Sequence, residues 1–165
     1  MRRGTLTLML VGMALAAVAD DGADAIRLAR LELAVSQLEG LRAVRRVQHA
    51  LNQYRLAGQW DEAAKLFTHD ARWDIGDAAS GGSSVEGREA IRAALEAEGG
   101  GGPLRPGVLN AHLLLSPVLS FDPDGQRIRG RWHQVSMTGI WKERADWAGG
   151  ILENEYALED GVWKI

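Results

Sequence analysis

The chain has 165 residues, of which 46% are hydrophobic and 25% charged, as is usual for a globular domain with one core. Its formal net charge is −3 and its Arg residues are dispersed among Asp and Glu, which argues against a nucleic-acid partner. Because there is no cysteine, disulfides, thiolate metal sites and a Cys nucleophile are excluded. The histidine spacing matches no metal motif, so we expect no metal and no other cofactor.

The N-terminus has the three parts of a secretory signal peptide. Arg2 and Arg3 form a basic start, a mostly apolar run follows, and Ala17-Val18-Ala19 matches the small-x-small pattern of a cleavage site. We therefore expect residues 1–19 to be a signal peptide and the mature protein to be periplasmic or secreted, without a stable membrane anchor. The alternatives are an uncleaved anchor and a buried N-terminal helix.

Residues 24–57 predict a helix, because apolar residues recur at helical spacing throughout this stretch. We expect Gly40 to break or kink this helix and Gly58 to cap its C-terminal end.

The rest of the chain predicts two more helices and an antiparallel meander. The expected elements, in chain order, are a helix from Trp60 to Phe67, a strand over 71–76, a loop over 80–87, a helix over 88–98 with a Gly-rich stop over 99–103, and strands over 108–121, 126–138, 147–158 and from 162 onward. Residues that favour turns separate the first two long strands at 122–125, and the last two at 159–161. Helices followed by such a meander predict an α+β fold.

The expected strand over 108–121 is apolar except for a polar pair, Asn110 and His112. Because side chains alternate along a strand, the pair shares one face, which is either satisfied in a core or lines a cavity. If the next strand pairs with this one directly around the turn, Phe121 lies opposite Gln126, and the residue numbers of each pair sum to about 247. His133 then lies diagonally across from His112. This register predicts two histidines in one pocket, facing the helices, with pKa values lowered by burial. A one-residue bulge would place them on opposite faces.

The order of motifs from Leu38 to Ile165 resembles a known family. The stretch LEGLRAVRRVQHALNQYRLAGQWDEAAKLFTHDARWDIG resembles the opening helices and first strand of the SnoaL-like (polyketide cyclase-like) branch of the nuclear transport factor 2-like superfamily. GREAIRAAL is similar to its third helix, and HLLLSPVLSFDPDGQRIRGRW and GGILENEYALEDGVWKI to its strands. The resemblance implies a cone-shaped α+β barrel, in which N-terminal helices pack on a curved, mostly antiparallel sheet around an apolar pocket.

The resemblance also implies where a site would lie. Dehydratases of this superfamily carry histidines on pocket-facing strands, and His112 and His133 occupy comparable places, so both are candidate catalytic acid/base groups. The plainer interpretation of each is a hydrogen-bonded core or surface histidine. Asn110 would orient His112 or a ligand carbonyl. The residues assigned to substrate binding are Tyr54, Trp73, Asn110 and Trp132.

Two functional hypotheses stay open. In the first, the chain is an exported protein that binds a small, largely apolar molecule and acts as a cofactor-free dehydratase, isomerase or cyclase. In the second, it is a non-catalytic binding or assembly module of the same fold. The histidine pair favours the first hypothesis. Leu56 favours the second, because many catalytic relatives have an acid at that position and Leu cannot take up a proton.

These predictions divide the chain into the signal peptide over 1–19, a helical extension over 20–37 and a SnoaL-like domain over 38–165. Because family members often dimerise through the exposed face of the sheet, we expect a homodimer. The extension either adds to this interface or packs on its own domain. Relatives also continue the strand that begins near Val162 for several more residues. We therefore expect the sheet to be incomplete at this edge or the sequence to be a fragment.

Overall fold

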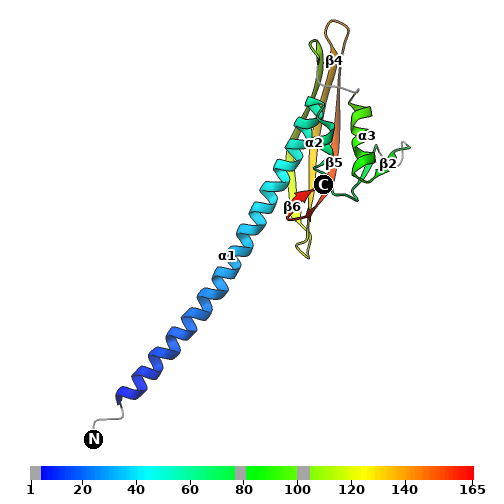
Figure 1. The fold of residues 1–165 in the computed structure, drawn as a ribbon. Helices are drawn as coiled ribbons and strands as arrows, with labels where there is room; N and C mark the ends of the chain where they lie inside the picture. The colour runs from blue at the N-terminus through cyan, green and yellow to red at the C-terminus, as the bar shows by residue number, and fades with distance from the viewer. Residues whose placement is uncertain (1–4, 77–80, 100–104) are drawn as a thin grey trace. The chain divides into compact units, whose positions relative to one another are not determined.

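The computed structural model describes residues 5–76, 81–99 and 105–165; for residues 5–21 and 75 it describes the backbone alone. The chain forms two compact units, Met1–Glu39 and Gly40–Ile165. The second unit contains the C-terminal part of helix α1, helices α2 and α3, and strands β1 to β6 (Figure 1).

Helix α1 spans Thr5–Ala57, and its helical backbone continues through Gly40, so the expected break is wrong. Gly40 is buried at a close contact instead. A Cβ atom added there would lie 3.0 Å from the ring of Phe121 and 3.3 Å from the indole nitrogen of Trp163. Gly58 follows the helix with a φ of +68°, a left-handed conformation that glycine adopts without strain, and the predicted cap is confirmed.

The expected signal peptide falls partly outside the described residues, which begin at Thr5, and its cleavage stays a prediction. Among the helices that the structure describes, none combines the length and the apolar character that crossing a membrane requires.

After α1 both predicted helices are present, although the first ends at Ala64 and not at Phe67, and the predicted loop is wrong. Helix α2 spans Trp60–Ala64 and helix α3 spans Arg88–Glu98. The strand β1, Arg72–Ile75, pairs antiparallel with β2, Ser83–Glu86, which lies in the expected loop. Packing explains the difference, since Trp73 pairs with Val85 and both are partly buried against the core. The Gly-rich stop beyond Gly99 lies outside the described residues.

Four strands form one antiparallel sheet in the order β3-β4-β5-β6. Their bounds are Val108–Phe121, Arg127–Ile140, Arg144–Glu159 and Val162–Lys164. The two predicted turns are present: Gly125 donates its N–H to the Asp122 carbonyl at 2.9 Å, and Asp160 and Gly161 both have positive φ, as a two-residue hairpin turn requires. The predicted α+β fold is confirmed, because the C-terminal part of α1 packs on this curled sheet (Figure 1).

A β-bulge interrupts the pairing of β3 with β4. Ser116 and Pro117 on β3 together face a single residue of β4, Trp132, and regular pairs lie on both sides. Proline has no N–H to donate to the ladder, and Ser116 has a φ of +49°. The predicted register is therefore wrong: His112 pairs with Ser136, and a shift of one residue exchanges the two faces of the strand.

The core of the second unit consists of two apolar clusters. The buried members of the first, contributed mainly by the helices, are Leu51, Trp60, Ala63, Phe67, Ala71, Ile91 and Leu95. The second joins α1 to the sheet through Val44, Ile128 and Tyr156, all with 0% exposure. Ile165 packs against both clusters, and its backbone exchanges hydrogen bonds with Leu66 and Thr68.

A buried hydrogen-bond network also ties α1 to the sheet. The side-chain oxygen of Gln48, which is 3% exposed, accepts hydrogen bonds from the Tyr156 hydroxyl and from the Asn154 amide, both at 2.7 Å. The Trp132 indole N–H donates to the Tyr156 oxygen at 3.2 Å. Because a buried polar group without a partner costs about 1–3 kcal/mol, the members of this network depend on one another.

We expect Gln48→Leu to lower the free energy of unfolding by about 1–3 kcal/mol, because the Tyr156 hydroxyl loses its acceptor and the Asn154 amide loses the shorter of its two hydrogen bonds. The matched control is Gln53→Leu, which makes the same change at an exposed position of α1 and should change stability by less than about 0.5 kcal/mol. Urea denaturation of both variants measures the difference. Equal free energies of unfolding for the two variants would show that the Gln48 network does not stabilise the packing of α1 on the sheet.

Glu159, at the end of β5, connects three segments. Its carboxylate accepts hydrogen bonds from Lys164, from the backbone N–H of His69 at 2.7 Å and from Arg88 on α3 at 2.6 Å. These contacts, Lys164 first, lower the pKa of Glu159 from its ordinary 4.5 to about 2. A carboxyl group whose pKa is lowered on folding stabilises the fold above its unfolded pKa.

This stabilisation should therefore be present above pH 4.5 and be lost as the pH falls towards 2. We expect Glu159→Gln to flatten the pH dependence of the melting temperature across this window, whereas Glu153→Gln, at an exposed carboxylate, should retain it. If the melting temperature of the Glu159→Gln protein depends on pH as steeply as that of the wild type, Glu159 is not the source of this stabilisation.

Candidate functional site

Four polar side chains on β3 and β4 form a hydrogen-bonded group on the inner face of the sheet, the face on which Ile128, Trp132 and Tyr156 are buried. We call this group the polar cluster, and its members are Asn110, His112, Gln134 and Ser136. Alternation along β3 places Asn110 and His112 together, as the sequence predicts. The bulge places them on the inner face, since it brings His112 opposite Ser136.

The hydrogen bonds of the polar cluster specify one neutral form of His112. The ring Nε2 lies 3.0 Å from the side-chain oxygen of Asn110, which can only accept, so Nε2 carries the proton. The Nδ1 atom is 2.9 Å from the Ser136 hydroxyl and 3.1 Å from the Gln134 amide nitrogen, which donate to it. The second amide hydrogen of Gln134 reaches the Ser136 oxygen at 2.7 Å. The ring therefore presents Nδ1 as its basic atom.

The surroundings of His112 favour this neutral form. Burial lowers its pKa below the ordinary 6.5, and the positive charge of Arg55 on α1 lowers it further. Glu98, at the end of α3, opposes these effects, and it forms an ion pair with Arg55 at 2.9 Å. A histidine that is unprotonated near pH 7 can accept a proton from a ligand.

Helix α1 holds the strand beneath the polar cluster. The Asn52 amide donates to the backbone oxygen of His112 at 2.6 Å, which fixes the strand at that residue. All four members of the polar cluster are partly exposed.

His133 lies elsewhere. It is exposed on the outer face of the sheet, where it pairs with Leu115 and Ile151. The prediction that His112 and His133 share a pocket is wrong, because the bulge shifts the register by one residue and exchanges the faces. Arg131, on the same outer face, forms an exposed ion pair with Glu153 at 3.5 Å.

The three aromatic residues predicted to bind substrate pack in or against the core. Trp132 is 1% exposed, and its indole N–H donates a hydrogen bond to the Tyr156 hydroxyl oxygen. Tyr54 and Trp73 are partly buried against the first apolar cluster. Leu56 is also partly buried.

A separate hollow of about 500 Å³ lies at the hairpin between β4 and β5. Val108, Leu109, Ile140 and Trp141 contribute its apolar lining, and no residue of the polar cluster takes part. It contains no histidine, so acid/base chemistry near neutral pH points to the polar cluster and not to this hollow.

Sequence reasoning missed four residues around His112: Asn52, Arg55, Gln134 and Ser136. The sequence does contain a signal for Gln134 and Ser136, because they are polar and two residues apart in an expected strand, like Asn110 and His112. Pro117 is the signal that could have predicted which face of the sheet they occupy, since a proline within a strand indicates a bulge or an edge. Nothing in the local sequence distinguishes Asn52 and Arg55 from other polar residues of α1.

Comparisons with known proteins agree with this architecture. The SnoaL-like domain family matches residues 36–165. A candidate scytalone dehydratase from Novosphingobium aromaticivorans is 20% identical with a TM-score of 0.62, over 77% of this chain and 79% of that one. A hexachlorocyclohexane dehydrochlorinase of type 2 is 18% identical with a TM-score of 0.63, over 79% and 82% of the two chains.

A nuclear transport factor 2-like protein with a cystatin-like fold, also from Novosphingobium aromaticivorans, is 16% identical with a TM-score of 0.65 over 81% and 82% of the chains. A search of curated proteins found no match. At these identities the structural neighbours establish the fold alone, and the family match covers most of the chain. The chain therefore belongs to the SnoaL-like domain family.

Proposed function

We propose that the protein binds a small carbonyl compound at the polar cluster and catalyses a cofactor-free elimination or isomerisation with His112 as the base. The observation that carries this proposal is the neutral, partly buried His112, held between Asn110 and Ser136 with its basic Nδ1 towards two side-chain donors. The names of two structural neighbours, a candidate dehydratase and a dehydrochlorinase, describe eliminations and support the same class.

In this proposal the substrate carbonyl lies beside Gln134 and Ser136, whose hydrogen bonds shift from Nδ1 of His112 to the carbonyl oxygen as negative charge develops there. The shift frees the lone pair of Nδ1. Nδ1 of His112 takes the proton from the carbon next to the carbonyl. The resulting imidazolium then donates that proton to a departing hydroxyl group, which leaves as water. Asn110 accepts the Nε2–H throughout and keeps the ring in the reactive orientation. The ligand has an apolar body, and its polar end occupies the cluster.

Leu56 favours a second candidate function, a non-catalytic binding module. At that position of α1 the chain has no group that can take up a proton, and both ring nitrogens of His112 already have hydrogen-bond partners in the protein. In this case the polar cluster binds the ligand and no turnover follows.

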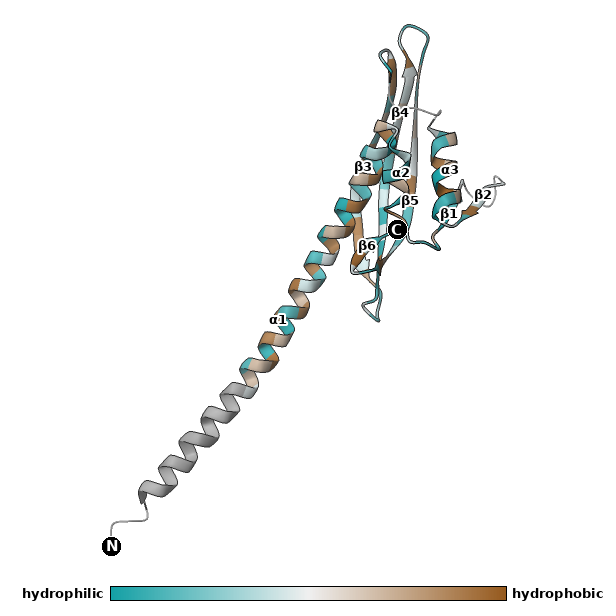
Figure 2. Ribbon diagram, viewed as in Figure 1, coloured by the Kyte–Doolittle hydropathy of each residue, from teal (hydrophilic) through white to brown (hydrophobic). Residues whose placement is uncertain are grey.

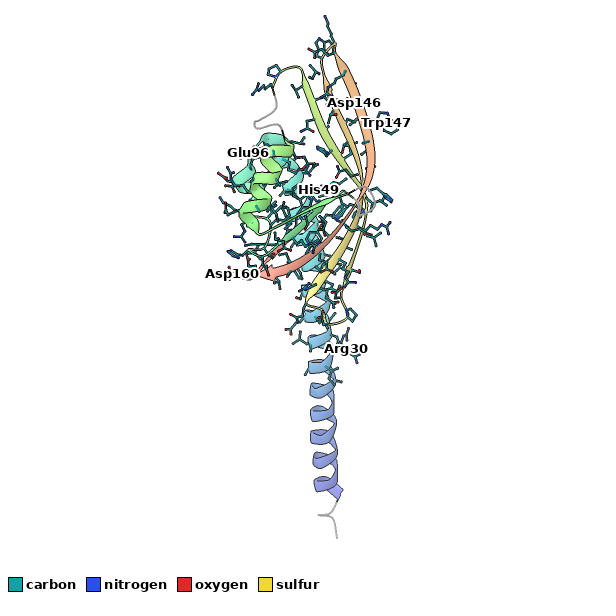
Figure 3. All side chains as sticks on the ribbon, turned by 90° about the vertical axis from the view of Figure 1, so that its right-hand side faces the viewer. Arg30, His49, Glu96, Asp146, Trp147 and Asp160 are labelled. Carbon is teal, nitrogen blue, oxygen red and sulfur yellow. The ribbon has the colours of Figure 1, made fainter. Side chains whose placement is uncertain are left out.

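The proposal also includes export and a homodimer. Export rests on the signal-like N-terminus, and the mass of the mature protein from its own host would test it. The dimer rests on the outer face of the sheet. Figure 3 marks one of its residues, Trp147 on β5, and the exposed apolar side chains of this face include Leu109, Leu113, Leu115, Val118, Trp147 and Ile151.

Aryl β-hydroxy ketones test the function, because their dehydration to a conjugated enone is read by ultraviolet absorbance. We expect His112→Gln to lower kcat/KM by about 10²-fold or more, since it removes the base. His133→Gln, a matched change on the outer face, should retain activity. In the wild type, kcat/KM should stay level from pH 8 to pH 7 and fall only below 6.5, because the pKa of His112 lies below that value.

Binding of a ketone without turnover, lost in His112→Gln, would favour the binding module. Turnover that survives in a folded His112→Gln protein, or that is lost equally in His133→Gln, would overturn the proposed role of the polar cluster.

A further inference from the structure

The part of α1 before Gly40 carries an exposed apolar stripe. Leu28, Leu31, Val35 and Leu38 follow one another at intervals of three, four and three residues, and each side chain is between 53% and 58% exposed. Figure 2 shows apolar and polar residues alternating along this stretch, which Arg30 marks in Figure 3. Such spacing is that of the a and d positions of a heptad repeat, the seam along which two helices pack.

Charged residues flank this stripe on both sides. With Leu28 at an a position, Arg27 is at g and Glu32 is at the following e. In a parallel, in-register pair of helices, each g residue faces the e residue of the next heptad on its partner, five positions further on. Two copies of the chain would thus form two opposite-charge pairs, each between Arg27 of one copy and Glu32 of the other. Within the described residues, no ion pair of the chain itself involves either side chain.

The sequence disfavours the other arrangements of such a pair. A shift by one heptad would place Val35 and Leu38 against Arg42 and Arg45, the next residues in the a and d series, both of which are exposed. An antiparallel pair centred on the stripe would bring Glu32 close to the same residue of the other copy, and like charges repel. Only the parallel, in-register arrangement joins the whole apolar seam and pairs the charges.

We propose that residues 28–38 bind the same segment of a second copy of this chain as a parallel, in-register, two-stranded coiled coil. This inference is independent of the proposed catalytic function and of the outer face of the sheet. Two heptads make a short coiled coil, so the interaction is a weak one that depends on protein concentration.

Single cysteines test the geometry, because the chain has none of its own. In the proposed pair, Leu31→Cys lies at a d position, where the Cα atoms of the two copies are within the separation of about 4.4–6.8 Å that a disulfide requires. We expect the oxidised full chain to run as a covalent dimer on a non-reducing gel. Leu33→Cys is the matched control: it is 60% exposed but lies at an f position, on the side of the helix away from the seam. Equal cross-linking of the two variants, or none in Leu31→Cys, would overturn the proposal.

Charge reversal tests the pairing in the Leu31→Cys background. Arg27→Glu and Glu32→Arg should each slow cross-linking by about threefold or more, because each creates like-charge contacts across the seam. The double reversal restores opposite charges and should return the rate to that of the unreversed protein. If the double variant cross-links as slowly as the single ones, or if the single ones have no effect, the parallel pairing is wrong.

Discussion

The β-bulge at Ser116 and Pro117 decides which side chains the sheet presents to α1. Between the turn and the bulge, Leu119 and Phe121 face inward and pack near the second apolar cluster. Without the extra residue, the same alternation would turn Leu113 and Leu115 inward and expose Asn110 and His112 on the outer face. The bulge therefore separates β3 into a half that builds the core and a half that carries the polar cluster.

The buried contacts of α1 make this inner face usable as a site. Gly40 allows the helix to approach the rings of Phe121 and Trp163, and the Gln48 network fixes it on β4 and β5. One turn further on, Asn52 holds the backbone of His112, and Arg55 contributes the charge that helps to keep its ring neutral. Packing, hydrogen bonding and the pKa of the candidate base thus follow from one face of one helix.

The sequence predicts the α+β class, the order of nearly all elements and the inner partnership of Asn110 with His112, because these depend on local periodicity and on turn residues. It does not predict the register of β3 with β4. Between the turn and the bulge, the expected pairing differs from the structure by two residues, which leaves the faces of the strands unchanged. Beyond the bulge it differs by one residue, which exchanges the faces. That single residue replaces His133 with Gln134 and Ser136 in the site. The contributions of Asn52 and Arg55 depend on tertiary packing, which no local pattern encodes.

Nuclear Overhauser effects from the imidazole protons of His112 test the central claim, that the bulge places this ring in the polar cluster. The account predicts cross-peaks from His112 to the side chains of Asn110, Gln134 and Ser136 and to Asn52 on α1, and none to His133. Cross-peaks from the His112 ring to His133 or Val135, with none to Ser136, would show that β3 and β4 pair without the face exchange and would contradict the account.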